Sequence, residues 1–188
     1  HDDGKKGISN QLALTIVNLL AARGTVYITS ERPLPLELDF YRISINPKDI
    51  HHAIYYASLY IGDSQTMAAE AAILGTPAIR YNDFVGKLGY LEELEHRFNL
   101  TYGIPVGDEQ ALIDRVKSIL ATENIDLVWK ERQEAMMDEL INVSEFFFWF
   151  MTRYPESKKD WQSNREEYVQ KFKGRREYLE KSISHQGA

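Results

Sequence analysis

The chain has 188 residues, with 22 Lys or Arg against 28 Asp or Glu, which gives a formal net charge of −6. This length is typical of one domain, or of one domain with an appendage. Duplex nucleic acid is excluded as an expected partner, because the acidic chain has no basic stripe to neutralise phosphates. The sequence has no cysteine, which excludes disulfides, thiolate metal sites and a cysteine nucleophile and fits the reducing cytoplasm.

The chain opens with a loop of glycine and lysine, H-D-D-G-K-K-G at residues 1–7, and a helical pattern follows it at once. Loops of this kind normally follow a strand. We therefore expect the chain to begin partway into a βαβ unit of a longer protein, the alternative being a tag or a disordered leader. Ser9 is placed to cap the helix, which the apolar spacing extends to about residue 23.

Strand and helix patterns alternate from Thr25 to Ala121. This alternation predicts a parallel sheet with helices on both faces, in a Rossmann-like α/β fold. Strands are predicted at residues 25–29, 59–62, 77–81 and 100–104, with a further short strand at 41–45, and helices at 46–57, 65–74, 90–99 and 108–120.

After Ile125 the pattern is helical only, with helices predicted at residues 127–141, 143–153 and 159–182 and a break at Pro155. We therefore expect two parts: residues 1–125 form a Rossmann-like domain that lacks its first strand, and residues 126–188 form a helical C-terminal extension.

The richest aromatic stretch is E-F-F-F-W-F-M-T-R-Y-P, at residues 145–155. A helix that is apolar nearly all round is typically buried, so most of these rings are expected in the core of their own domain. We also hypothesise that part of this surface faces a domain outside the chain.

The longest apolar run, Phe146–Met151, is far shorter than the roughly 20 residues of a membrane helix, so no transmembrane segment is expected.

The segment at residues 61–82, I-G-D-S-Q-T-M-A-A-E-A-A-I-L-G-T-P-A-I-R-Y-N, carries the strongest functional signal. A strand ends, a polar turn follows and a helix rich in alanine begins. The free amides and positive dipole end of that helix suit a phosphate, and Ser64 and Thr66 add hydroxyls there. Glu70 lies one turn further along, where its carboxylate can accept hydrogen bonds from a ribose. The alternative is structural: Asp63 and Ser64 are helix caps and Glu70 is a solvated residue.

This segment resembles the nucleotide-binding helix in the C-terminal domain of GT-B-type enzymes, especially UDP-N-acetylglucosamine 2-epimerases, with the pattern D-S-G-G-x-x-E-E-A-x-x-x-G-x-P. The matching positions are Asp63, Ser64, Glu70, Ala71, Gly75 and Pro77. The resemblance implies that Ser64 and the backbone after it contact diphosphate and that Glu70 holds the ribose. Gln65 and Thr66 replace the glycine pair, and Ala69 replaces the first glutamate.

A closer resemblance is to an uncharacterised prokaryotic family related to those epimerases and to GT-B glycosyltransferases. The matching motifs lie at residues 1–7, 29–35 and 62–80, and the resemblance covers most of residues 1–120. Members of that family have a preceding Rossmann-like half. The resemblance therefore implies a partner domain outside this chain, with the sugar nucleotide bound between the two.

Four residues of the opening loop are further candidates. Lys5 and Lys6 lie between two glycines, where backbone can approach a phosphate and the lysines supply charge, so we expect them to bind the same ligand. The alternative is a solvated, flexible terminus. His1 and Asp2 match the family motif and are candidates for a catalytic acid–base or orienting pair.

Arg80, at the end of a predicted strand, can bind an anion bidentately or form a structural ion pair.

His51 and His52 are adjacent, so on a helix their side chains diverge and make a poor chelate, and no metal site is expected.

Together these features predict the C-terminal nucleotide-diphosphate-sugar-binding domain of a glycosyltransferase or sugar-nucleotide epimerase, acting in surface polysaccharide synthesis. The sugar nucleotide is the substrate, and no separate cofactor is expected. Residues 1–188 alone are expected to be inactive. Two alternatives stay open: an intact 2-epimerase-like isomerase, and a non-catalytic module that binds a sugar phosphate or a partner on the same fold. Gln65 and Ala69 favour the second alternative.

Overall fold

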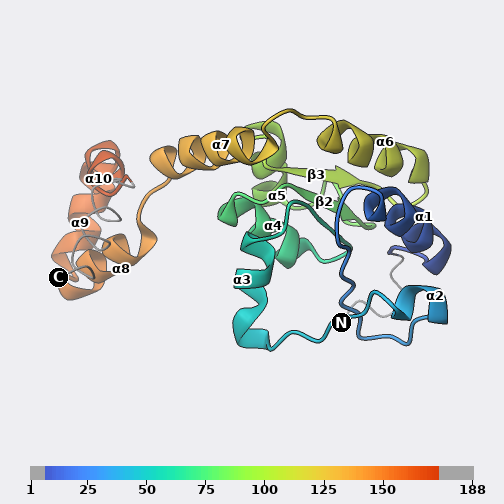
Figure 1. The fold of residues 1–188 in the computed structure, drawn as a ribbon. Helices are drawn as coiled ribbons and strands as arrows, with labels where there is room; N and C mark the ends of the chain where they lie inside the picture. Colours follow the sequence, from blue (N-terminus) through green and yellow to red (C-terminus); the bar gives the residue numbers. More distant parts are fainter. Residues whose placement is uncertain (1–6, 174–188) are drawn as a thin grey trace, which may run out of the picture. The chain divides into compact units, whose positions relative to one another are not determined.

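The computed structural model describes residues 7–173 (Figure 1). The chain forms two compact units, divided between Gln133 and Glu134. This division falls inside α7 (Ile125–Glu139), the helix whose first residue is the domain boundary expected from the sequence. Within the described residues, no helix has the length and apolar character needed to cross a lipid bilayer.

The first unit contains a parallel sheet of three short strands in the order β1-β2-β3 (Figure 1). The strands are β1 (Tyr60–Gly62), β2 (Ala78–Tyr81) and β3 (Thr101–Ile104). All four residues of β2 are buried, as expected of a central strand covered on both faces. This confirms the coarse prediction of a Rossmann-like α/β unit with a parallel sheet.

Helices cover both faces of this sheet. Ala78 packs with the alanines of α4 (Gln65–Leu74), and Arg80, two residues on and therefore on the same face, reaches α5 (Gly89–His96). Tyr81 points to the other face, where its hydroxyl accepts a hydrogen bond from the Gly107 amide just before α6 (Glu109–Leu120). All three helices lie within a few residues of their predicted positions.

The two strands predicted at residues 25–29 and 41–45 are wrong. Only a single parallel bridge forms, between Ile28 and Arg42, through hydrogen bonds from Ile28 N to Tyr41 O and from Ile43 N to Ile28 O. The short helix α2 (Leu36–Asp39) lies between the two segments. An isolated pair of strands is marginal in water, so β-branched residues alone do not sustain a ladder here.

Two further helices precede the sheet. The first, α1 (Asn10–Ala21), begins at the predicted cap, because the Ser9 hydroxyl accepts a hydrogen bond from Leu12 N. The helix predicted from Asn46 starts where expected but as a 3₁₀ turn, η1 (Pro47–Asp49), before α3 (Ile50–Tyr55).

The second unit is helical, with α8 (Val143–Thr152), α9 (Glu156–Ser163) and α10 (Arg165–Lys171) following α7. The single helix predicted at 159–182 is wrong within the described residues, because Asn164 leaves helical geometry at φ −134° and ψ 41°. Residues 174–182 lie outside the described part. Phe146, Trp149 and Phe172 form an aromatic cluster, whereas Phe148 keeps 73% of its surface exposed.

Candidate functional site

The candidate site begins where β1 ends and α4 begins, at residues 62–66, which we name the α4 tip. Ser64 has extended backbone angles, and its hydroxyl accepts a hydrogen bond from Met67 N at 3.3 Å, which caps the helix. Its side chain therefore has the structural role that the sequence left open. The amides of Gln65 and Thr66 precede the first possible intrahelical acceptor, so they stay available to a ligand.

The α4 tip is accessible. Asp63 and Thr66 are exposed and Ser64 is half-buried, so no side chain within residues 7–173 plugs the helix end. Gln65 is half-buried too, but its Oε1 atom is buried without a hydrogen-bond partner. The tip thus combines a positive helix end with a side-chain acceptor that the described residues leave unsatisfied.

Gly7, the last residue of the opening loop, packs directly against Asp63. A Cβ atom at Gly7 would lie 2.4 Å from Asp63 Oδ2, so only glycine fits at this distance. Arg32 donates a hydrogen bond to the carbonyl oxygen of Ile8, which ties the same segment to the loop after residue 28. The structure thus brings Gly7 to the G-D-S motif, which lies more than fifty residues further along the sequence.

Four residues proposed from the opening loop, His1, Asp2, Lys5 and Lys6, lie outside the described residues. Their proposed catalytic and phosphate-binding roles therefore stay predictions.

Asn82, which the sequence analysis missed, supports the tip from the neighbouring strand. Its side-chain amide donates to the carbonyl oxygen of Asp63 at 2.9 Å, and its Oδ1 accepts from Phe84 N at 2.9 Å. Asn82 is buried and follows β2 directly. A polar residue immediately after a buried strand was the available signal, because the carboxyl ends of parallel strands share one edge.

Glu70 lies on α4 beside α3. Its Oε2 atom is 3.4 Å from Nε2 of His51, and its side chain keeps 35% of its surface exposed. The carboxylate is therefore partly solvated and only weakly paired, because an exposed partner at this distance contributes little. His52 is exposed, and no group of three metal-binding side chains occurs within the described residues.

The surroundings of Arg80 do not suit the anion-binding role that the sequence left open for it. Its side chain is 0% exposed, and Nη2 contacts Glu92 Oε1 and Glu95 Oε2, each at 2.9 Å. A guanidinium enclosed by two carboxylates does not present an open anion site. The structure thus gives Arg80 the internal ion pair that the sequence left as its alternative, and we leave it out of the proposed site.

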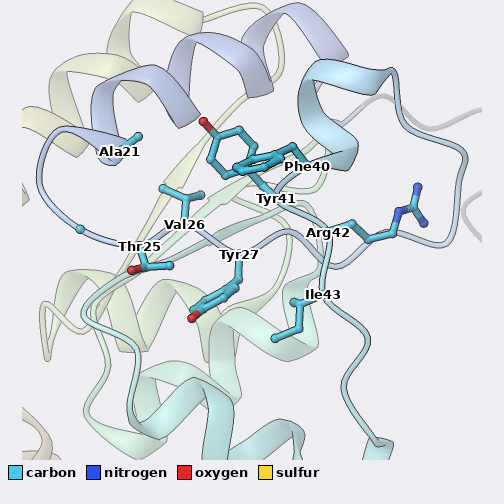
Figure 2. Close-up of a pocket in the computed structure, with 9 residues that line it drawn as sticks. Ala21, Thr25, Val26, Tyr27, Phe40, Tyr41, Arg42 and Ile43 are labelled. Atoms are coloured by element: carbon cyan, nitrogen blue, oxygen red, sulfur yellow. The ribbon is translucent and has the colours of Figure 1, made fainter.

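A cavity of about 400 Å³ opens elsewhere in the first unit (Figure 2). It lies between the end of α1 and the segments joined by the Ile28–Arg42 bridge, and Val26, Tyr41 and Arg42 line it. None of its lining residues belongs to the α4 tip, so it is distinct from the candidate site.

In comparisons with known proteins, no protein-family model and no curated protein matches the chain.

Proposed function

We propose that the first unit binds the nucleotide-diphosphate part of a sugar nucleotide at the α4 tip. The whole protein then transfers or epimerises the sugar as a GT-B-type enzyme, in the synthesis of a surface polysaccharide. This unit acts as the C-terminal of two Rossmann-like domains, and the site faces the other one. Residues 1–188 alone bind the nucleotide without turning it over.

The observation that carries this proposal is the contact between Gly7 and Asp63 at the start of α4. It supports a shared phosphate site, because it brings Gly7 to the positive end of a helix at the carboxyl edge of a parallel sheet. Backbone at a glycine approaches a phosphate closely, and the helix amides donate to its oxygens. Ligands of open α/β sheets generally bind at this edge.

In the proposed mode, the amides of Gln65 and Thr66 and the Thr66 hydroxyl hold the diphosphate. Helix amides neutralise a leaving diphosphate without a bound metal, because their dipoles are already oriented. Glu70 accepts hydrogen bonds from the ribose, one turn further along. Lys5 and Lys6 add positive charge to the diphosphate, and His1 and Asp2 contribute acid–base chemistry from the same loop.

Calorimetric titration of the chain with UDP, GDP and CMP tests this proposal. We expect at least one of them to bind, and Glu70→Gln to weaken that binding about tenfold, because a charged acceptor of ribose hydroxyls is lost. Glu109→Gln is the matched control, an exposed glutamate in the first turn of α6, and should bind as the unchanged chain does.

Failure of all three nucleotides to bind, both to this chain and to a longer protein carrying the preceding half, would instead favour the non-catalytic binding module. Equal binding by the unchanged chain and Glu70→Gln would remove the ribose role of Glu70 while leaving the diphosphate site in place.

A further inference from the structure

Tyr60, the first residue of β1, places its hydroxyl near the carboxyl end of the same strand. A Cβ atom at Gly62 would lie 2.2 Å from the Tyr60 hydroxyl oxygen. The phenol therefore lies along its own strand and ends over Gly62, the first residue of the α4 tip. Glycine is required there because any side chain would displace the hydroxyl.

Packing fixes the ring that carries this hydroxyl. Tyr60 contacts a core cluster of Ile54, Ala68, Ala71 and Ala78, to which α3, α4 and β2 contribute. A side chain held on three elements has little freedom left to lose, so its hydroxyl is preorganised for a ligand.

The surroundings also keep the hydroxyl protonated. Burial raises the pKa of Tyr60, and the negative charges of Asp63 and Glu70 raise it further. A neutral hydroxyl that feels the charge of Glu70 suits a sugar, because the hydroxyl can donate to a sugar oxygen while the carboxylate accepts hydrogen bonds from the diol.

We propose that Tyr60 is a ribose-binding residue, whose hydroxyl donates a hydrogen bond to the 2′-hydroxyl of the ribose diol that Glu70 accepts from. This inference rests on the proposed function and adds a specificity: the site distinguishes ribonucleotides from 2′-deoxyribonucleotides. Tyr60 and Glu70 contact the sugar from β1 and α4, while the helix amides hold the diphosphate.

The test is calorimetric titration with UDP, GDP and CMP, each beside its 2′-deoxy counterpart, for the unchanged chain and for Tyr60→Phe. The unchanged chain is expected to prefer the ribonucleotide by roughly tenfold. Tyr60→Phe keeps the ring in its cluster and loses about fivefold in ribonucleotide affinity, the value of one neutral hydrogen bond, with no change for the deoxy form. The preference therefore shrinks by the same factor, which a purely structural role of the ring does not explain.

Two further variants secure the result. Tyr90→Phe removes a hydroxyl from a half-exposed tyrosine on α5 and should change neither affinity. Gly62→Ala leaves Tyr60 in the chain but displaces its hydroxyl, and should reproduce the loss of preference. Circular dichroism of each variant verifies that it folds.

The outcomes separate this inference from the proposed function. An unchanged ribose preference in Tyr60→Phe overturns the role of Tyr60 and leaves the nucleotide site standing. Equal binding of ribo and deoxy forms by the unchanged chain overturns the ribose roles of both Tyr60 and Glu70 while keeping the diphosphate site. No binding of any nucleotide overturns both proposals.

Discussion

Two polar groups occupy neighbouring positions on one face of the sheet, and they differ in what surrounds them. Gly62, Arg80 and Gly103 are aligned across the three strands, and we name them the glycine–arginine row. The Tyr60 hydroxyl fills the space above Gly62, and the Arg80 guanidinium fills the space above Gly103. In both places a glycine makes room for a polar group from a neighbouring residue.

The surroundings separate the two groups. Arg80 is fully buried, and two carboxylates of α5 close around it. The Tyr60 hydroxyl lies next to the α4 tip, where Asp63 and Thr66 are exposed. The Arg80 charge is paired inside the protein through Nη2, while its Nε and Nη1 atoms are buried without a partner among the described residues. The hydroxyl of half-buried Tyr60 instead lies beside exposed residues that a ligand can reach. Arg80 therefore has a structural role, and the contrast supports the binding role proposed for Tyr60.

The largest expected effect on stability comes from replacing Arg80. Arg80→Ala should lower the free energy of unfolding of the first unit by about 3–5 kcal/mol, because it leaves two half-buried carboxylates without their partner. Urea unfolding followed by circular dichroism measures this loss. A change below about 0.5 kcal/mol would contradict the structural assignment of Arg80.

A smaller effect is expected at Gly103. The Cβ atom of Gly103→Ala would lie 2.9 Å from Arg80 Nη2 and 2.9 Å from Val85 Cγ1, and such overpacking costs about 1–3 kcal/mol. The matched control is Gly89→Ala, where a Cβ atom meets nothing within 4 Å. It should leave the melting temperature unchanged or raise it, since alanine favours the helix. Equal melting temperatures in the two variants would mean that Gly103 is not closely covered.

Comparing two serine caps tests the binding role proposed for the α4 tip. Ser64→Ala and Ser9→Ala each remove a hydroxyl that caps a helix, so each should lower the free energy of unfolding by about 1 kcal/mol. Ser64→Ala should also weaken nucleotide binding, and more than Ser9→Ala does, because α4 begins at the proposed site whereas Ser9 lies two residues beyond Gly7. Calorimetry with the nucleotide that binds the unchanged chain separates the two; a matching loss of affinity in Ser9→Ala would show a general stability effect instead.

The smallest effect concerns pH. The hydrogen bond from Arg80 lowers the pKa of Glu92, against burial, which raises it, and the Gly86 amide and His96 lower it further. The folded state therefore favours the ionised form. This stability is fully present above the ordinary carboxyl pKa and is lost as the pH falls through the lowered one. Glu92→Gln should consequently show a shallower decline in urea-unfolding stability below about pH 4 than the unchanged chain; parallel declines would contradict this.

Local patterns predicted the elements whose signals are local. The helix after Ser64 begins and ends as predicted, because Ser64 supplies an N-terminal cap and Gly75 takes a left-handed φ of +81° at the end. The Asp108 cap of α6 follows the same logic. The failed strand at residues 25–29 has the right composition, but a strand needs a neighbour, and that depends on tertiary context.

The site was predicted only as far as its residues follow one another in the chain. The tip at Ser64 could be read from a polar turn between a strand and a helix. The contact of Gly7 with Asp63, and the Tyr60 hydroxyl over Gly62, arise from side-chain packing in space. Arg80 shows the same limit, because its carboxylate partners lie twelve and fifteen residues further on.

The most direct test of the central claim is nuclear magnetic resonance of the ¹⁵N-labelled chain during titration with UDP, GDP and CMP. With the nucleotide that binds, we expect the largest chemical-shift changes at the amides of Gln65, Thr66 and Gly7, with smaller ones around Glu70. Shifts confined to the cavity lined by Val26 and Arg42, or no shift at the α4 tip at saturating nucleotide, would contradict it.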